Sequence, residues 1–335
     1  MHYLTLLLTA IPAVGLLLNI FLFYVIWTNR RVASAYSGFL MISTIYTFCY
    51  ALGTMTVDPM FVNDNHGYTI FSLRLVTFGA EWSRYGAIAQ NLIFCAGFVF
   101  SFVHTLYRYC TITGKMSFIF DTKLGLFFVI FSPIAFSALW LFMIIATQEP
   151  TVERLGDRAR MIYEMFQVNL TTDGFTGGQF WDTDGIRWLD LNGALALSFM
   201  SGIIFQLNVF ITWKLHGHVK TVVCSQATRE AQAQLVAILT AQLCVTCITE
   251  IIPCTMVIWG GFLGLSSLCP YSPVIANLFP TFNVCIIVLL VKAFRLRTLE
   301  IFSFCIKIKA KETFHSAYSI TSINPFVVDK GNAPQ

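Results

Sequence analysis

Hydrophobic residues in this chain gather into seven long runs that are separated by shorter polar stretches. The runs cover residues 4–27, 36–57, 85–107, 124–146, 191–213, 235–260 and 273–291. Each is close to the length of about 20 residues that an α-helix needs to cross the hydrocarbon core of a bilayer. The pattern predicts an all-α membrane protein in which seven transmembrane helices, over residues 1–291, form one bundle.

The composition agrees with a membrane protein. Of the 335 residues, 56% are hydrophobic and only 11% are charged, whereas an ordinary soluble domain has about 25% charged residues. The first run is not typical of a secretory signal, because it lacks a basic region before it and is followed by Arg30 and Arg31. We expect this run to be retained as the first helix.

The distribution of Lys and Arg predicts the orientation of the bundle. With the N-terminus outside, fifteen of these residues fall in the inner loops and tail and six in the outer loops. This bias follows the positive-inside rule, which counts short loops most heavily. The chain is therefore expected to be a multi-pass protein of the plasma membrane with its N-terminus outside.

The longest outer loop, residues 147–190, is rich in acidic and aromatic residues. Loops of this length are either functional or disordered, so this one is a candidate lid over an outward cavity. It also contains the Asn169-Leu170-Thr171 triplet, an acceptor pattern for N-glycosylation on the outer side.

Basic and bulky apolar residues alternate over residues 292–311, directly after the seventh run. This interleaving predicts an amphipathic helix that lies along the inner leaflet. Cys305 in this segment is a candidate palmitoylation site, with an unmodified cysteine as the equal alternative. Residues 312–335 are expected to be a disordered cytoplasmic tail.

The polar residues within the runs are too few for an enzyme, whose active site needs several convergent polar groups. Glu250 is the only acid in a predicted helix core, and His104 the only histidine. Only Cys269 of the ten cysteines lies in a predicted outer loop, which excludes a disulfide framework. We therefore expect a non-enzymatic protein without catalytic residues, bound metal or cofactor, and without a nucleic-acid partner.

Glu250 is the strongest candidate for a functional residue, because a carboxylate at membrane depth is costly and usually has a purpose. Gln90, Asn91 and Asn277 lie in the outer parts of their predicted helices and could line one cavity with it. The four residues are candidate ligand contacts. The alternative for Glu250 is a structural glutamate that is protonated or hydrogen-bonded to another helix.

Several short motifs resemble a known family, the nematode serpentine chemoreceptors of the Str superfamily, which includes the Str, Srd, Srh and Srj groups. The motifs span most of the chain, from the second predicted helix to the inner-leaflet helix. They are His104 with Tyr107-Arg108-Tyr109; Gln232-Ala233-Gln234-Leu235, Leu239, Gln242 and Pro253; Pro59, His66 and Tyr68; Phe279-Pro280; and Lys292-Ala293-Phe294-Arg295.

The resemblance implies a receptor that binds a small environmental molecule, such as an odorant, and signals through a heterotrimeric G protein in a sensory neuron and its cilium. Arg108 would then be the arginine that faces the G-protein cavity, with Tyr107, Tyr109, Lys292 and Arg295 as further candidate contacts. An arginine has five donors and a permanent charge, so it can change partners when helices part. The alternative is a boundary arginine that reaches the lipid headgroups.

Three features depart from related receptors. Tyr107 stands where rhodopsin-like receptors have an acid before the arginine, and residues 111–223 contain no cysteine for their outer disulfide. The Asp-Pro pair often found in the seventh helix of the family is Asn283-Val284 here, and Thr246 replaces a frequent proline. A ligand-gated channel or transporter with seven helices is the rival function, and an accessory membrane protein without a ligand is a third.

Overall fold

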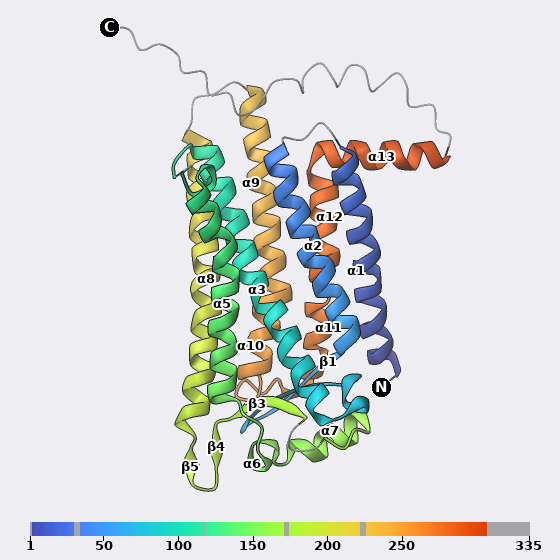
Figure 1. Ribbon diagram of the computed structural model, residues 1–335, viewed down its shortest axis with the longest axis vertical. Helices are drawn as coiled ribbons and strands as arrows, with labels where there is room; N and C mark the ends of the chain where they lie inside the picture. Colours follow the sequence, from blue (N-terminus) through green and yellow to red (C-terminus); the bar gives the residue numbers. More distant parts are fainter. Residues whose placement is uncertain (1, 30–33, 117, 171–173, 222–225, 307–335) are drawn as a thin grey trace.

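The structure is a computed structural model that describes residues 2–29, 34–116, 118–170, 174–221 and 226–306. Its long helices lie side by side in one bundle (Figure 1). Six of these helices, or seven if one bent pair is counted as a single span, are long and apolar enough to cross a membrane. They are α1 (His2–Thr28), α2 (Ser34–Val57), α3 (Ala80–Thr113), α5 (Lys123–Thr147), α8 (Trp188–Thr221), α9 (Gln226–Thr246) with its continuation, and the bent pair.

The sixth and seventh spans are both irregular in their outer halves. Helix α9 passes through a π-helical turn, η2 (Cys247–Ile251), into α10 (Ile252–Trp259). The seventh span is broken into a short outer part, η3 (Ser266–Tyr271) and α11 (Ser272–Ala276), and an inner helix, α12 (Phe279–Leu290), with a bend of 44°. Prolines lie at the starts of α10, α11 and α12, because the first turn of a helix tolerates a missing N–H.

The bundle faces apolar surroundings on its outside. Large apolar side chains such as Leu17 and Phe199 are exposed along the helices, at 68% and 69%, which is the arrangement expected where lipid replaces water. Inside the bundle, many hydroxyl groups donate within their own helix, as where Thr44 Oγ1 donates to the carbonyl of Leu40 at 2.8 Å. A carbonyl one helical turn back is an available partner in a medium that supplies none.

One end of the bundle carries a small antiparallel sheet that the sequence analysis did not predict. The strands β1 (Pro59–Asp64) and β2 (Gly67–Ser72) form a hairpin after α2, and β3 (Phe175–Gln179) from the long loop pairs with β2. Val62 pairs with Thr69 and Phe71 with Phe175. The sheet thereby joins the two outer loops. A two-residue pair, β4 (Trp181–Asp182) and β5 (Gly185–Ile186), extends beyond it.

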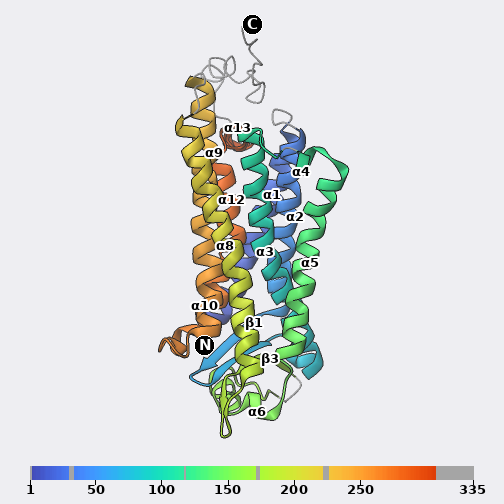
Figure 2. The ribbon, with the colours of Figure 1, turned by 90° about the vertical axis from the view of Figure 1, so that its left-hand side faces the viewer.

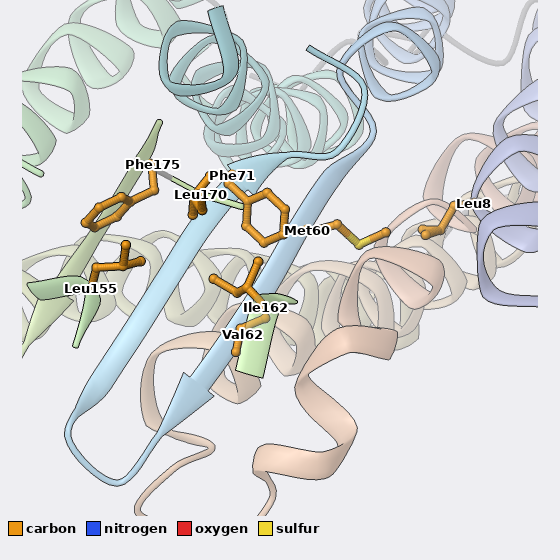
Figure 3. Packing of buried hydrophobic residues seen from close by; sticks show 8 residues of the cluster. All are labelled: Leu8, Met60, Val62, Phe71, Leu155, Ile162, Leu170 and Phe175. Carbon is orange, nitrogen blue, oxygen red and sulfur yellow. The ribbon is translucent and has the colours of Figure 1, made fainter. Parts of the chain in front are cut away.

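The sheet is covered on both faces. Its outer face packs in a hydrophobic cluster with α7 (Arg158–Phe166) and Leu8 of α1 (Figure 3). This cluster consists of Leu8, Met60, Val62, Phe71, Leu155, Ile162, Leu170 and Phe175. The opposite face, which includes Tyr68 and Ile70, packs against α3, α8 and α10. Alternation of side chains along each strand produces the two faces, and it places one of them against the helices. The short helices η1 (Leu75–Phe78) and α6 (Val152–Leu155) complete this end.

At the other end, α13 (Lys292–Ile306) lies across the bundle rather than along it (Figure 1). Phe294 is fully buried against Leu22, Val25 and Ile26 of α1. Asn29 Nδ2 donates to the carbonyl of Ala293 at 3.1 Å. The structure thus describes residues 292–306 of the predicted amphipathic segment, whereas the predicted tail at 312–335 lies outside the described residues. A short helix, α4 (Phe118–Asp121), precedes α5 at this end.

The start of α1 and the sheet lie at one end of the molecule, and α13 lies at the other (Figures 1 and 2). Following the orientation that the Lys and Arg distribution predicts, we call these the outer end and the inner end. The fold is the predicted seven-helix bundle with an added outer sheet.

Candidate functional site

A cavity lies directly beneath the outer sheet, inside the helix bundle. Pro59, Phe61, Tyr68 and Ile70 of the hairpin form its roof, and residues of α2, α3, α5, α8, α10 and α11 form its walls. The volume of this cavity is about 60 Å³, which suits a small molecule. Buried concave sites with few polar groups are typical of ligand pockets.

The roof is held by charged groups at its edge. Arg154 forms a bidentate ion pair with Asp190 of α8, with Nη2–Oδ1 at 2.7 Å and Nε–Oδ2 at 2.8 Å. The backbone N–H of Gln179 at the end of β3 donates to the same carboxylate at 3.0 Å. Asp190 therefore connects the long loop, the sheet and the first turn of α8.

A second buried arginine anchors α7 to the hairpin. Arg158 Nη1 lies 2.8 Å from Asp64 Oδ1, and its Nε donates to Thr69 Oγ1 at 2.9 Å. Asp64 Oδ1 also accepts the backbone N–H of His66 and Gly67, which closes the turn between β1 and β2. Burial lowers the pKa of Arg158 from its ordinary value, and the adjacent Asp64 carboxylate opposes this change.

We call the sheet of β1, β2 and β3, together with α6 and α7, the cap of the cavity. Both outer loops contribute to this cap. The long loop was expected to be the lid, but the first outer hairpin forms the surface that meets the cavity. The long loop adds an edge strand and the covering helix α7. Among the described residues between 147 and 190, only Gln148 lines the cavity.

Three of the four predicted ligand contacts line this cavity: Gln90, Asn91 and Asn277. Gln90 Nε2 donates to Thr54 Oγ1 at 2.7 Å, which orients its amide. Asn91 Oδ1 accepts the indole N–H of Trp140 at 2.9 Å. Within the described part of the chain, Gln90 Oε1 and Asn277 Nδ2 are buried without a hydrogen-bond partner. Asn277 Nδ2 is available to a bound molecule, whereas Gln90 Oε1 lies against Gly53 of α2, where an added Cβ would clash with it.

The structure does not place Glu250 with the other three. Its neighbours Pro253 and Cys254 line the cavity, but Glu250 itself does not. An added Cβ on Gly97 of α3 would be 2.8 Å from Glu250 Oε1 and 2.5 Å from Tyr46 Oη. The absence of a side chain at Gly97 therefore lets the carboxylate sit against α3, below the cavity. The π-helical turn η2, which contains Glu250, is a feature often found at functional sites.

A second, more polar cavity lies on the inner side of this contact. Tyr46, Gly97, His104, Gln242 and Asn283 contribute to its lining. Gln242 Nε2 donates to Asn283 Oδ1 at 3.1 Å, which connects α9 to α12. Glu250 is thus near the boundary between an outer apolar cavity and an inner polar one.

Arg108 is buried inside the inner end of the bundle, with 3% of its surface exposed. Its Nε donates to Nε2 of His104, one turn earlier in α3, at 3.3 Å. Helix α3 continues beyond Arg108 to Thr113. The guanidinium therefore lies among the helices, which differs from the alternative of an arginine that reaches out to headgroups.

The two tyrosines beside Arg108 contact different elements. The Tyr107 ring stacks on Phe39 of α2 at 5.4 Å between centroids and meets Phe120 of α4 edge-on at 5.1 Å. Tyr109 packs against a cluster that includes Leu215 of α8 and Leu239 of α9. The inner end of α3 thereby touches four neighbouring helices.

The family-model comparison matches residues 7–299 to the serpentine type 7TM GPCR chemoreceptor Str family. The chain belongs to this chemoreceptor family. Among solved structures, it is similar to squid rhodopsin with a TM-score of 0.56 and 13% sequence identity, over 99% of this chain and 91% of that one. At that identity the likeness shows the fold alone. No curated protein matches the chain.

The remaining predicted sites of the receptor lie at its two ends. Lys292 and Arg295 are exposed at the start of α13, and Arg295 Nη1 donates to the carbonyl of Leu289 at 3.4 Å. Asn169 is exposed at the outer end, although Thr171 of its acceptor triplet lies outside the described residues. The backbone of Cys305 is in the last turn of α13, but its side chain is outside the described part. No group of three or more His, Cys, Asp or Glu in the described ranges could hold a metal ion.

The hairpin that forms the roof of the cavity, and the residues that hold it, were not predicted from the sequence. Tyr68 belongs to the motifs of the family resemblance, but nothing in the sequence indicates that it lines a cavity. Gln148 is not distinguished from the other polar residues that follow the fourth span. The alternation in Met60-Phe61-Val62 and Tyr68-Thr69-Ile70 around the Asn65-His66 turn could have indicated the hairpin.

Proposed function

We propose that this receptor is a G-protein-coupled chemosensory receptor. A small environmental molecule binds in the outer cavity beneath the sheet, and a heterotrimeric G protein binds at the inner end. The observation that carries this proposal is the small cavity at the outer end, which is lined by Gln90, Asn91 and Asn277 and where Asn277 Nδ2 has no hydrogen-bond partner among the described residues. The proposed location is the plasma membrane, in particular that of a sensory cilium.

Gln90, Asn91 and Asn277 are the proposed ligand contacts. Glu250 would act on the ligand indirectly, since its carboxylate lies against Gly97 and Tyr46 below the cavity. A ligand that moves Tyr50, Pro253 or Cys254 on the cavity wall would also move the elements that position Glu250. Binding favours whichever arrangement of the helices has the higher affinity.

Arg108 is the proposed centre of the G-protein contact, with Tyr107, Tyr109, Lys292 and Arg295 around it. Support comes from its burial among the inner ends of the helices and from its hydrogen bond to the neutral nitrogen of His104. A neutral imidazole is a weaker partner for a guanidinium than a carboxylate. The hydrogen bond between Arg108 and His104 can therefore be exchanged at moderate cost when the inner ends of α3 and α9 separate.

Expression of the receptor with a calcium or cAMP reporter, screened against volatile and water-soluble odorants, tests this function. We expect an agonist to raise the reporter signal in the wild type. Arg108→Ala should abolish most of the signal while the receptor remains at the cell surface. Arg160→Ala, which changes an exposed arginine at the outer end, is the matched control and should signal normally.

Two results would contradict the proposal. Full signalling by surface-verified Arg108→Ala would show that this residue is not needed for coupling. An agonist-evoked current that survives blockade of G proteins would favour a ligand-gated channel instead.

A further inference from the structure

The outer cavity is free of charge on every side. None of its nineteen described lining residues is Asp, Glu, Lys, Arg or His. A buried ion without a partner is strongly disfavoured in such surroundings. The lining therefore discriminates against a ligand that must keep a charge when it binds.

Three acids near the cavity lie outside its lining. Asp64 of the cap and Asp190 of α8 are each paired with an arginine, Arg158 and Arg154. Glu250, the acid nearest the cavity floor along the chain, lies against Gly97 of α3 and is outside the lining. An amine ligand would find no carboxylate in the cavity, and a carboxylate ligand would find no cation.

A polar group nonetheless remains available in the lining of the cavity. Asn277 Nδ2, at the break between α11 and α12, is a donor without a hydrogen-bond partner in the described part of the chain, and the residue is more than nine-tenths buried. The amide of Gln90 is directed at α2, with its Oε1 against Gly53. The hydrogen bond from Gln90 Nε2 to Thr54 fixes which end of that amide is the oxygen. The remaining surface is mainly aromatic and aliphatic, including Phe94, Trp140 and Leu197.

We infer that the ligand of this cavity is a neutral, mainly apolar small molecule with a hydroxyl or carbonyl group, and that amine cations and carboxylate anions are rejected. The oxygen of this hydroxyl or carbonyl group accepts a hydrogen bond from Asn277 Nδ2. This inference rests on the proposed ligand-binding function of the cavity and narrows the chemical class of ligand.

Direct binding to the purified full-length receptor in nanodiscs tests the inference without relying on G-protein signalling. The probes share one carbon skeleton: hexan-1-ol, hexan-2-one, hexylamine and hexanoic acid. The shift in apparent Tm with probe concentration gives each apparent Kd. We expect the two neutral probes to bind at least about tenfold more tightly than the two ionised ones, because an uncompensated buried charge is costly.

Asn277→Asp introduces a carboxylate of nearly the same shape into the cavity. We expect it to weaken the binding of hexan-1-ol and to strengthen the binding of hexylamine. The ratio of the two Kd values should change in favour of the amine by about tenfold or more. Gln90→Glu should change the ratio of Kd values in the same direction, and it replaces Asn277→Asp as the test variant if Asn277→Asp does not fold. Asn208→Asp, in a buried asparagine of α8 that does not line the cavity, is the control and should leave the ratio unchanged.

Equal binding of ionised and neutral probes would overturn the inference, as would the absence of binding by either neutral probe. A receptor that binds hexan-1-ol selectively but never activates a G protein would contradict the proposed signalling function and leave the ligand class standing.

Discussion

Buried arginines at the two ends of the bundle have different partners. At the outer end, Arg154 and Arg158 each form an ion pair with a carboxylate, and the Arg154–Asp190 pair is bidentate. At the inner end, the Nε of Arg108 donates to a histidine nitrogen. An arginine–carboxylate pair carries charge on both partners and can be bidentate, which adds geometric specificity, whereas the acceptor nitrogen of an imidazole is uncharged. Of the contacts named here, the two ion pairs at the outer end therefore resist rearrangement more strongly than the hydrogen bond between Arg108 and His104.

This difference matches the proposed roles of the two ends. A cap held by buried ion pairs keeps the outer cavity in one shape, which favours selective recognition of a small ligand. The inner contacts, such as Gln242 with Asn283, join α9 to α12 through a single neutral hydrogen bond. Because such bonds contribute only about 0.5–1.5 kcal/mol each, ligand binding can supply enough free energy to change them.

The largest expected effect is at the Arg154–Asp190 pair. Arg154→Ala leaves the Asp190 carboxylate buried without its bidentate partner, so it should reduce the stability of the cap by about 3–5 kcal/mol. Hydrogen exchange of the β3 amides, including Gln179, measures this loss. Arg160→Ala on the neighbouring helix α7 removes an ion pair whose side chains are 77% and 68% exposed, and exchange there should hardly change. If Arg154→Ala and Arg160→Ala behave alike, the buried pair does not hold the cap.

A smaller effect is expected where α2, α3 and the sixth span meet. Gly97→Ala would place a methyl group 2.5 Å from Tyr46 Oη and 2.8 Å from Glu250 Oε1, so both side chains must move. Overpacking of this kind costs about 1–3 kcal/mol, which should appear as a lower melting temperature of the purified receptor. Gly202→Ala in α8, where nothing lies within 4 Å, is the control. An unchanged melting temperature for Gly97→Ala would show that the contact is not tight.

The smallest effect is expected at Asp58, which is buried at the outer end of α2 with Oδ1 unpartnered in the described structure. Burial raises its pKa, and Arg74 partly opposes the shift. Because the folded pKa exceeds the unfolded one, the ionised carboxylate destabilises the fold above that pKa, and the cost disappears as the pH falls. Asp58→Asn should therefore raise the melting temperature at neutral pH and weaken its rise on acidification.

Asparagine also tolerates the positive φ of 53° at position 58, so the substitution changes charge with little backbone strain. Asp184→Asn, in the exposed β4–β5 turn, is the matched control for removing one negative charge. A lower melting temperature for Asp58→Asn at neutral pH would show that its carboxylate stabilises the cap.

Hydropathy was sufficient to predict the bundle, because a lipid-facing helix must be apolar over nearly its full length. The predicted run at 85–107 marks only the membrane part of α3, which extends from Ala80 to Thr113, since ends that leave the lipid have no hydropathy signal. The break at Asn277 was not predicted either. Pro273 and Pro280 indicate irregular backbone, but an uninterrupted apolar run conceals the bend.

The sequence predicts only those residues of the site that are polar and lie within apolar runs. Gln90, Asn91 and Asn277 are identifiable as candidates because amide side chains are unusual within an apolar run. The structure brings all three to one cavity. Glu250 stood out for the same cause, but its position depends on the missing side chain of Gly97 and on the π-helical turn. The pairing of Arg154 with Asp190, 36 positions apart, depends on tertiary contacts that no local pattern encodes.

Hydrogen exchange of the receptor with and without an agonist from the odorant screen tests the central claim most directly, because it follows both ends in one experiment. The account predicts that agonist leaves exchange in β1, β2 and β3 unchanged or slower, and accelerates exchange at the inner ends of α3 and α9 near Arg108 and Leu239. Faster exchange in the cap with no change at the inner ends would contradict it.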